Sequence, residues 1–479
     1  MSTRKNFAYN LVLTASNYIF PLITYPYVSR VLGVTNLGIC NYVDSIIQYF
    51  ILFSTLGIVS FGVREIARYS NDFEKCSRTF SNLFAINLFL TVIAACVLVA
   101  MTLFVPHFSP YRPFLFVGLV KLFANLFLTE WFFQGIQQFK YITIRSIAVR
   151  LIYVVSIFCF VRDADDSVIY YILTVLTIVL NGAMNWRYSL KFRKFSLKGL
   201  TPSMFIMPIL VFGYYRILTS MYTTFNVVFL GSVAGDTEVG YFTTATKLYT
   251  IIMSVFTAIT TVMVPRISQL IHEKKKQQIQ EIADQIFSAL EVLSIPIIVF
   301  SQFYADEIIY ILSGAGYEGA IVPFKIVIFM LLIIGFEQVA IQQFLMATTS
   351  NKSVMIVSTI GAIVGITLNM MLTGKLGSVG SSLSWGLSEF AVLITGLILI
   401  KKLIGVSLRY KDLLINGLYA IAYIVPLYFV DKFIPGITSF FVSGVTIFLL
   451  FILVNLKVHP NTLIVSFWNS FKMRIPFIK

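Results

Sequence analysis

Residues 7–31 read FAYNLVLTASNYIFPLITYPYVSRV, and the only charged side chain among them is Arg30, close to the end of the run. A helix of this length can cross the ~30 Å hydrocarbon core of a lipid bilayer. The run is too long for the apolar core of a signal peptide, and it lacks a small-residue cleavage site. It is therefore predicted to remain in the protein as a first membrane span.

Apolar runs of similar length recur along the 479-residue chain, in which 58% of residues are hydrophobic and 12% are charged. These values and a mean hydropathy of +0.86 lie far outside the range of soluble proteins. We expect an all-α polytopic membrane protein of about 14 transmembrane helices. The predicted spans lie near residues 7–31, 38–63, 80–105, 113–135, 143–161, 167–190, 205–230, 239–264, 285–305, 321–347, 353–373, 377–400, 412–430 and 437–456.

An internal repeat is visible at a shift of about 200 residues. Leu32-Gly33 leads through a short loop to Gly38, and Leu230-Gly231 leads in the same way to Gly240. Each repeat holds an even number of spans, so both begin on the same side of the membrane and are parallel. We expect two parallel six-helix lobes at residues 1–198 and 199–402, followed by a terminal helix pair and a basic cytoplasmic tail at 403–479.

The chain has 36 Lys and Arg residues against 21 acidic ones, which gives a net charge of +15. If the N-terminus is cytoplasmic, most of the bases fall in loops on that side, including the basic runs at 187–198 and 274–276. The positive-inside rule then predicts that both termini are cytoplasmic. The runs are expected to lie beside anionic membrane lipids. No nucleic-acid partner is expected, because no aromatic-basic surface domain accompanies these runs.

Four predicted spans carry polar side chains at helical spacing, which indicates a face turned to protein or water. The uncharged members could instead form hydrogen bonds between helices. A charged side chain inside a membrane costs at least ~2.5 to 3.5 kcal/mol, so it persists only where it faces a partner or water. The candidate substrate-binding residues are Asn10, Asn17, Asp44, Gln48, Lys121, Arg216, Asn226 and Lys247.

The bases among these candidates suit a phosphate-bearing substrate, since Arg binds phosphate through paired donors and Lys as a point charge. The four cysteines and three histidines are scattered, which indicates neither a metal site nor a disulfide. No nucleophile–base pair and no glycine-rich phosphate loop is visible, so neither enzymatic activity nor a cofactor is expected. The acids Asp44, Glu337 and Glu389 could pair with bases or carry protons or cations.

Several segments resemble the polysaccharide flippase family, which moves O-antigen and related repeat units. This family lies in the superfamily that also holds multidrug exporters and the lipid-II flippase. The resemblance covers most of the chain, but Asn226 stands where the family often has an acid. The matching residues are Pro21, Pro26–Gly33, Gly62–Ala67, Glu130–Gly135, Tyr141–Thr143, Val264–Ser268, Asn369, Gly377, Gly380 and Glu389.

The resemblance implies a flippase that carries polyprenyl-diphosphate-linked oligosaccharide from the cytoplasmic to the outer leaflet of a bacterial inner membrane by alternating access. Glycan polymerases and glycosyltransferases would then be its protein partners. One alternative is a cation-coupled multidrug antiporter of the same architecture, which should have a mainly acidic cavity, whereas the candidates here are mainly basic. Another is a non-transporting scaffold for a glycan-assembly complex.

Overall fold

A computed structural model describes residues 3–196, 200–261, 264–348, 351–434, 436–458 and 465. Over these residues the chain is helical, and none of them lies in a β-strand. The chain forms two compact units. Unit 1 comprises residues 1–243, 313–316 and 368–381, and unit 2 comprises residues 244–312, 317–367 and 382–479.

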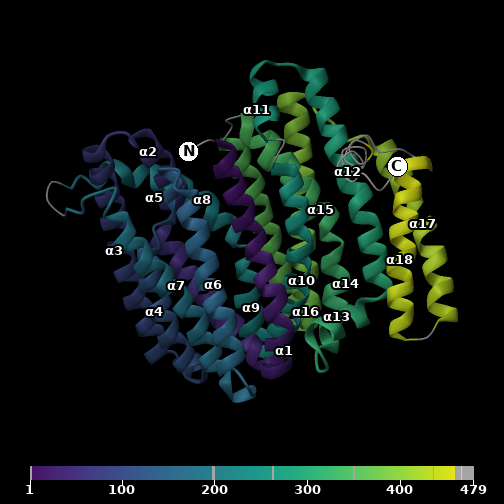
Figure 1. The fold of residues 1–479 in the computed structure, drawn as a ribbon, viewed down its shortest axis with the longest axis horizontal. Coiled ribbons are helices and arrows are strands. Elements are labelled where there is room, and N and C mark those ends of the chain that lie inside the picture. Colours follow the sequence, from purple (N-terminus) through teal and green to yellow (C-terminus); the bar gives the residue numbers. More distant parts are fainter. Residues whose placement is uncertain are drawn as a thin grey trace. The chain divides into compact units, whose positions relative to one another are not determined.

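Unit 1 is a bundle of long helices in which α3, α4, α6 and α7 run side by side (Figure 1). The long helix α1 contacts α3, α4 and α6, and its second half contacts α9. The helices of unit 1 are α1 (Thr3–Thr55), α2 (Ile58–Arg68), α3 (Phe73–Phe104), η1 (Pro106–Tyr111), α4 (Arg112–Leu128), α5 (Glu130–Gly135), α6 (Phe139–Phe160), η2 (Ala164–Asp166), α7 (Ser167–Ser189), α8 (Ser203–Ser220) and α9 (Thr224–Ala234).

Unit 2 is built around α12, which packs against α15, α17 and α18. Its elements are most of α10 (Asp236–Thr261), α11 (Val264–His272), α12 (Lys276–Phe303), α13 (Ala305–Ser313), η3 (Glu318–Ala320), α14 (Ile321–Ile328), α15 (Met330–Glu337), the π-helix η4 (Gln338–Leu345), η5 (Met346–Thr348), most of α16 (Asn351–Ile404), α17 (Tyr410–Phe433), α18 (Ile437–Leu453) and the π-helix η6 (Val454–Val458).

Eleven described helices are long and apolar enough to cross a membrane. Two of them, α1 and α16, are each long enough for two crossings, and each is interrupted by a glycine with positive φ, Gly33 (φ 72°) and Gly377 (φ 56°). The architecture agrees with the predicted all-α polytopic class and is consistent with about 14 spans.

The repeat has a clear register in the structure. Gly33 (φ 72°, ψ 171°) and Gly235 (φ 89°, ψ 175°) have nearly the same backbone conformation, and each stands between two consecutive spans. The predicted pairing of Gly33 with Gly231 is therefore wrong by four residues, and the shift is 202. The error arose because Leu-Gly stands at the turn in the first half but four residues before it in the second, and only the positive φ of Gly33 and Gly235 marks the turning residue.

Residues related by this shift touch each other. The Thr35 and Thr237 hydroxyl oxygens are 2.9 Å apart, and the Asn41 amide donates to the Thr243 hydroxyl at 3.1 Å. Contact between equivalent residues is what a two-fold relation produces at its axis. The internal repeat is thus also a local symmetry within unit 1.

An aromatic core lies at the end of unit 1 where α1 begins. Phe80, Phe132 and Phe133 are fully buried there, and Trp131 and Trp186 pack against them. Arg193, from the basic run at 187–198, is also in this core with only 1% of its surface exposed. The prediction that this run lies beside lipid headgroups is therefore wrong for Arg193.

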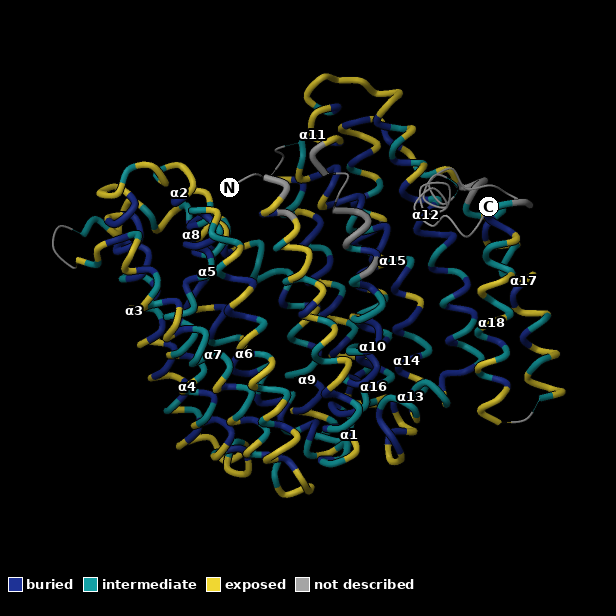
Figure 2. The backbone as a smooth tube through the Cα atoms, in the orientation of Figure 1, coloured by how far each residue is buried: buried dark blue, intermediate teal, exposed yellow. Residues whose placement is uncertain are grey.

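Apolar side chains cover much of the outside of both units. Figure 2 shows exposed positions along α4, α17 and α18. The apolar residues exposed on these helices include Phe116, Leu418 and Phe441. Exposed apolar surface of this extent suits contact with lipid. The predicted basic tail lies, from residue 459 onward and apart from Val465, outside the described residues.

Candidate functional site

The first half of α1 exposes polar side chains on an otherwise apolar helix. Asn10, Asn17 and, further along, Gln48 are all exposed. Asn17 also accepts a hydrogen bond from the Arg150 guanidinium on α6, which donates to Ser16 as well. Asn17 is thus both exposed and bonded to another helix, so the two interpretations of the polar stripe hold at once for this residue.

Lys121 on α4 and Asp44 on α1 form an ion pair, with 2.5 Å between the Lys121 Nζ and Asp44 Oδ1 atoms. The Tyr171 hydroxyl on α7 donates to the same carboxylate oxygen at 3.3 Å. Lys121 is 14% exposed at its side chain, whereas Asp44 is 43% exposed. The charge of Lys121 is therefore neutralised within unit 1, and the accessible member of the pair is the acid.

Arg216 lies on α8 and is half-buried. No described carboxylate lies within ion-pairing distance of its guanidinium. The neighbouring hydroxyls of Thr219 and Ser220 donate to backbone carbonyls of their own helix, including the carbonyl of Arg216. Within the described part of the chain, Arg216 is thus a cation in a membrane helix that has no counter-ion.

Lys247 is half-buried on α10 and belongs to unit 2, whereas Arg216 belongs to unit 1. Along α10, the Thr250 and Ser254 hydroxyls donate to carbonyls one turn back on the same helix. Such hydroxyls have a satisfied donor and keep a free acceptor capacity. The face of α10 that carries these hydroxyls can therefore contact water while its hydrogen bonds to the helix backbone stay intact.

Asn226 is fully buried on α9, in a cluster with residues of α16 that belong to the same unit. Asn369 donates to the Asn226 side chain, and the Thr373 hydroxyl donates to Asn369 at 2.9 Å. The hydroxyl oxygens of Thr373 and Ser381 are 3.2 Å apart, within hydrogen-bonding distance. The position where the family often has an acid is thus occupied by an uncharged network of amides and hydroxyls.

Unit 2 contains two acids of α15 and α16 that sequence reasoning left without a role. Glu389 accepts a hydrogen bond from the Trp385 indole at 2.9 Å. Glu337 lies near enough to interact electrostatically with Glu389, and both interact with the buried Tyr249. The Tyr249 ring meets Trp385 edge-on, with centroids 5.5 Å apart.

Sequence reasoning also missed a buried polar network around Arg145 on α6. The guanidinium donates to Glu130 at the start of α5 and to Asn185 on α7, and Asn185 donates in turn to the Leu128 carbonyl. This network satisfies a carbonyl at the break between α4 and α5, where Thr129 has φ 34°. Glu130 belongs to a segment that carries the family resemblance, and this was the available indication of its importance.

The described residues contain no group of three or more His, Cys, Asp or Glu side chains that could hold a metal ion. The model for the family described as "Polysaccharide biosynthesis protein" matches residues 3–272, more than half of the chain. The chain belongs to this family. A second model, MatE, matches residues 214–371 of this polysaccharide biosynthesis protein.

Two proteins named "Putative O-antigen transporter" are similar in sequence. The one from Escherichia coli (strain K12) is 26% identical over 341 residues, which cover 68% of this chain and 79% of that protein. The one from Shigella dysenteriae is 25% identical over 273 residues, which cover 56% of this chain and 68% of that protein. The polysaccharide flippase resemblance seen in the sequence is thereby confirmed.

Solved structures share the fold of this family member. The lipid II flippase MurJ in an inward closed conformation matches with a TM-score of 0.75 at 14% identity, over 93% of this chain and 97% of that one. An inward-facing multidrug resistance MATE transporter matches with a TM-score of 0.67 at 15% identity, over 82% and 98%. The protein is therefore a multi-pass membrane protein with the fold of these transporters.

Proposed function

We propose that the protein translocates polyprenyl-diphosphate-linked oligosaccharide from the cytoplasmic to the outer leaflet of a bacterial inner membrane by alternating access. Membership of the polysaccharide biosynthesis family and the O-antigen transporter relatives support this proposal. The observation that carries it is Arg216, a cation in a membrane helix with no described carboxylate within reach. A diphosphate would supply the missing counter-charge.

In this mechanism the sugars and the diphosphate occupy a wet cavity, while the polyprenyl tail stays in lipid. Arg216 is the proposed ligand of the diphosphate in unit 1, and Lys247 is a proposed substrate ligand in unit 2. Lys121 joins them only when its pair with Asp44 opens. The exposed amides of Asn10, Asn17 and Gln48 offer donors and acceptors to sugar hydroxyls.

The membrane potential favours export of this substrate. Moving a negative charge outward across an inside-negative membrane gains ~2.3 kcal/mol per elementary charge and 100 mV. No nucleotide is required in this scheme. The termini are placed in the cytoplasm by the distribution of Lys and Arg, and glycosyltransferases and a glycan polymerase are the proposed partners that supply and consume the substrate.

A multidrug antiporter remains the competing function, because MATE transporters share the fold. A cationic drug would be repelled by Arg216 and would need exposed acids. Asp44 is half-exposed but paired with a lysine, which weakens this alternative.

The test is flux of a fluorescent polyprenyl-diphosphate oligosaccharide in proteoliposomes. We expect Arg216→Ala to lower flux about tenfold or more, because a charge-assisted hydrogen bond contributes ~1.5 to 3 kcal/mol. Arg216→Lys should retain part of the flux, and Lys276→Ala, an exposed base at the start of α12, should retain all of it. Unchanged flux in correctly folded Arg216→Ala, or export of cationic dyes only, would contradict the proposal.

A further inference from the structure

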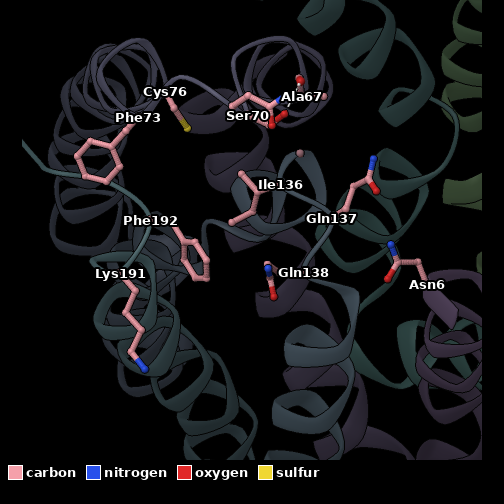
Figure 3. Close-up of a pocket in the computed structure, with 12 residues that line it drawn as sticks. Asn6, Ala67, Ser70, Phe73, Cys76, Ile136, Gln137, Gln138, Lys191 and Phe192 are labelled. Atoms are coloured by element: carbon pink, nitrogen blue, oxygen red, sulfur yellow. Dashed lines mark hydrogen bonds between the residues drawn. The ribbon is translucent and has the colours of Figure 1, made fainter. Parts of the chain in front are cut away.

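A pocket of about 650 Å³ opens at the end of unit 1 where α1 begins (Figure 3). It lies between the start of α1, the end of α2, the first turn of α3, the α5–α6 connection and the segment that follows α7. None of the eight candidate residues identified from the sequence lines it. Pockets of this size accommodate one or a few sugar rings.

Amide side chains dominate the polar lining. Asn6, Asn71, Gln137 and Gln138 all line the pocket, and among the described lining residues Lys191 alone is charged and none is a carboxylate. Figure 3 places Gln137 and Asn6 on one side and the rings of Phe73 and Phe192 on the other. Amides both donate and accept, as sugar hydroxyls do, and flat rings provide an apolar wall for the face of a sugar.

Asn6 supplies an independent indication of a ligand. Only 8% of its surface is exposed, and its side-chain oxygen is buried with no hydrogen-bond partner among the described residues. A buried acceptor left without a donor destabilises the fold. Rotation of the Asn6 side chain toward the pocket would let this oxygen accept a hydrogen bond from a bound hydroxyl, so Asn6 is suited to a ligand that carries donors.

The α5–α6 connection holds two of the lining residues in fixed positions. Gln137 has φ 58°. Its backbone N–H donates to the Gln134 carbonyl, and the backbone N–H of Gln138 donates to the Phe133 carbonyl. These two bonds form a Schellman cap at the end of α5, which places Gln137 and Gln138 in the pocket lining.

An anionic group would find a better position close by. A second cavity, of about 640 Å³, is lined by Lys75, Arg78 and Lys194 together with serine hydroxyls, and Glu74 is the one acid among its described lining residues. Residues 73 and 76 of α3 line the first pocket, whereas 75 and 78 line the second. The amide-lined pocket is therefore suited to the neutral part of a glycan rather than to phosphate.

We propose that the amide-lined pocket binds a neutral sugar residue of the glycan before translocation. The inference rests on the proposed function, in which the substrate is a lipid-linked oligosaccharide. In the proposed orientation the pocket opens to the cytoplasm, the side from which the substrate enters.

The test uses the full-length protein in lipid nanodiscs and, as the probe, free oligosaccharide released by mild acid from the lipid-linked repeat units of the host cell. Binding is measured by saturation-transfer NMR and calorimetry. We expect Asn71→Ala with Gln138→Ala to weaken binding about five- to hundredfold, since two hydrogen bonds to the sugar are lost. Gln278→Ala, an exposed amide on α12, should bind as the intact protein does.

A second variant guards against misfolding as the explanation. Asn6→Leu removes the unpartnered oxygen, so the ligand-free protein should melt at the same temperature or higher while its affinity for the probe falls. A lower melting temperature with unchanged affinity would overturn the assignment of Asn6. Displacement of the probe by inorganic pyrophosphate would overturn the neutral-sugar assignment.

Flux of the lipid-linked substrate, measured in parallel, separates the two proposals. If flux persists but the probe fails to bind, or binds equally to all variants, the pocket proposal fails alone. If the probe binds and the variants weaken it, the pocket proposal is supported even where no flux is found, and then the proposed function fails instead.

Discussion

A charged residue in a membrane helix is stable only with compensation, and Lys121 and Asp44 show how this chain provides it. We expect Lys121→Met to lower the free energy of unfolding by about 1 to 3 kcal/mol, because Asp44 loses its partner. Asp44→Asn should lower the free energy of unfolding by a similar amount, because Lys121 then has no counter-ion in this pair. The double variant should recover much of the loss.

Thermal unfolding in detergent measures the difference in stability between the intact protein and the Lys121 and Asp44 variants. Because the Asp44 side chain is 43% exposed, water can replace part of the lost interaction, and the shift should lie toward the lower end of that range. A double variant that melts no higher than either single variant would show that the pair does not stabilise the fold.

Arg193 presents a different kind of compensation. Its guanidinium carbon lies 3.5 Å from the Phe80 ring centroid and 4.5 Å from that of Trp186, and one nitrogen donates to the Ser189 hydroxyl. Burial lowers the pKa of Arg193 to about 10, so at neutral pH the folded state still contains a buried charge. Because this pKa is below the unfolded one, the titration of Arg193 adds stability only as the pH rises above about 10.

Arg193→Lys should therefore destabilise unit 1 by about 1 to 2 kcal/mol, since an ammonium group is more strongly hydrated and cannot stack on Phe80. Arg187→Lys, at an exposed position on α7, is the matched control and should melt as the intact protein does. Equal melting of the two variants would show that the rings contribute nothing specific.

The bases at 121, 216 and 247 could be found from the sequence because charge in an apolar run is conspicuous. Their partners could not, because pairing depends on which helices become neighbours. Asp44 was selected as a substrate ligand and is an ion-pair partner, and Asn226 is buried in an uncharged network. The unsatisfied side-chain oxygen of Asn6 emerges only from the packing.

Helices α1 and α10 approach each other closely at two glycines. A Cβ atom on Gly38 would lie 1.9 Å from the Asp236 carbonyl oxygen, and one on Gly240 would lie 2.3 Å from that of Val34. Both obstacles are backbone atoms, which cannot rotate away. Only glycine allows this approach.

Gly38→Ala and Gly240→Ala are each expected to destabilise the protein toward the upper end of ~1 to 3 kcal/mol or beyond, because the helices must separate. Gly417→Ala on α17 is the matched control, since nothing lies within 4 Å of the added carbon, and alanine favours a helix. The fraction of protein that stays folded after heating should be lower for the Gly38 and Gly240 variants than for Gly417→Ala. If Gly38→Ala stays folded as well as the intact protein does, α1 and α10 are not in contact at that position.

The all-helical class and the approximate positions of most spans followed from hydropathy, because each span must satisfy its backbone hydrogen bonds within lipid. The breaks within the spans could not be predicted from hydropathy. Hydropathy placed one continuous span near 321–347, where the chain forms α14, α15 and the π-helix η4. Breaks of this kind depend on local backbone geometry, and hydropathy does not record it.

For the molecule as a whole, the distribution of charge makes a prediction about orientation. In a variant whose four cysteines are replaced by serine, Asp165→Cys should react in intact cells with a maleimide that cannot cross the membrane. Glu273→Cys should react only after permeabilisation. Both positions are exposed, so reactivity reports sidedness. The opposite pattern would reverse the proposed direction of transport.

The two-repeat organisation was predictable because it leaves a trace in the sequence, whereas the lobe boundaries at 198 and 402 stay predictions. The contacts within the chain change from unit 1 to unit 2 at residue 243, and segments 313–316 and 368–381 return to unit 1. Such exchanges arise from packing between distant segments, which no local pattern reveals.

The contacts between Thr35 and Thr237 and between Asn41 and Thr243 also limit how the two repeats can vary. Each pair joins positions that stand 202 residues apart and occupy the same place in the two repeats. A substitution at any of these four positions therefore alters a contact that belongs to both repeats at once.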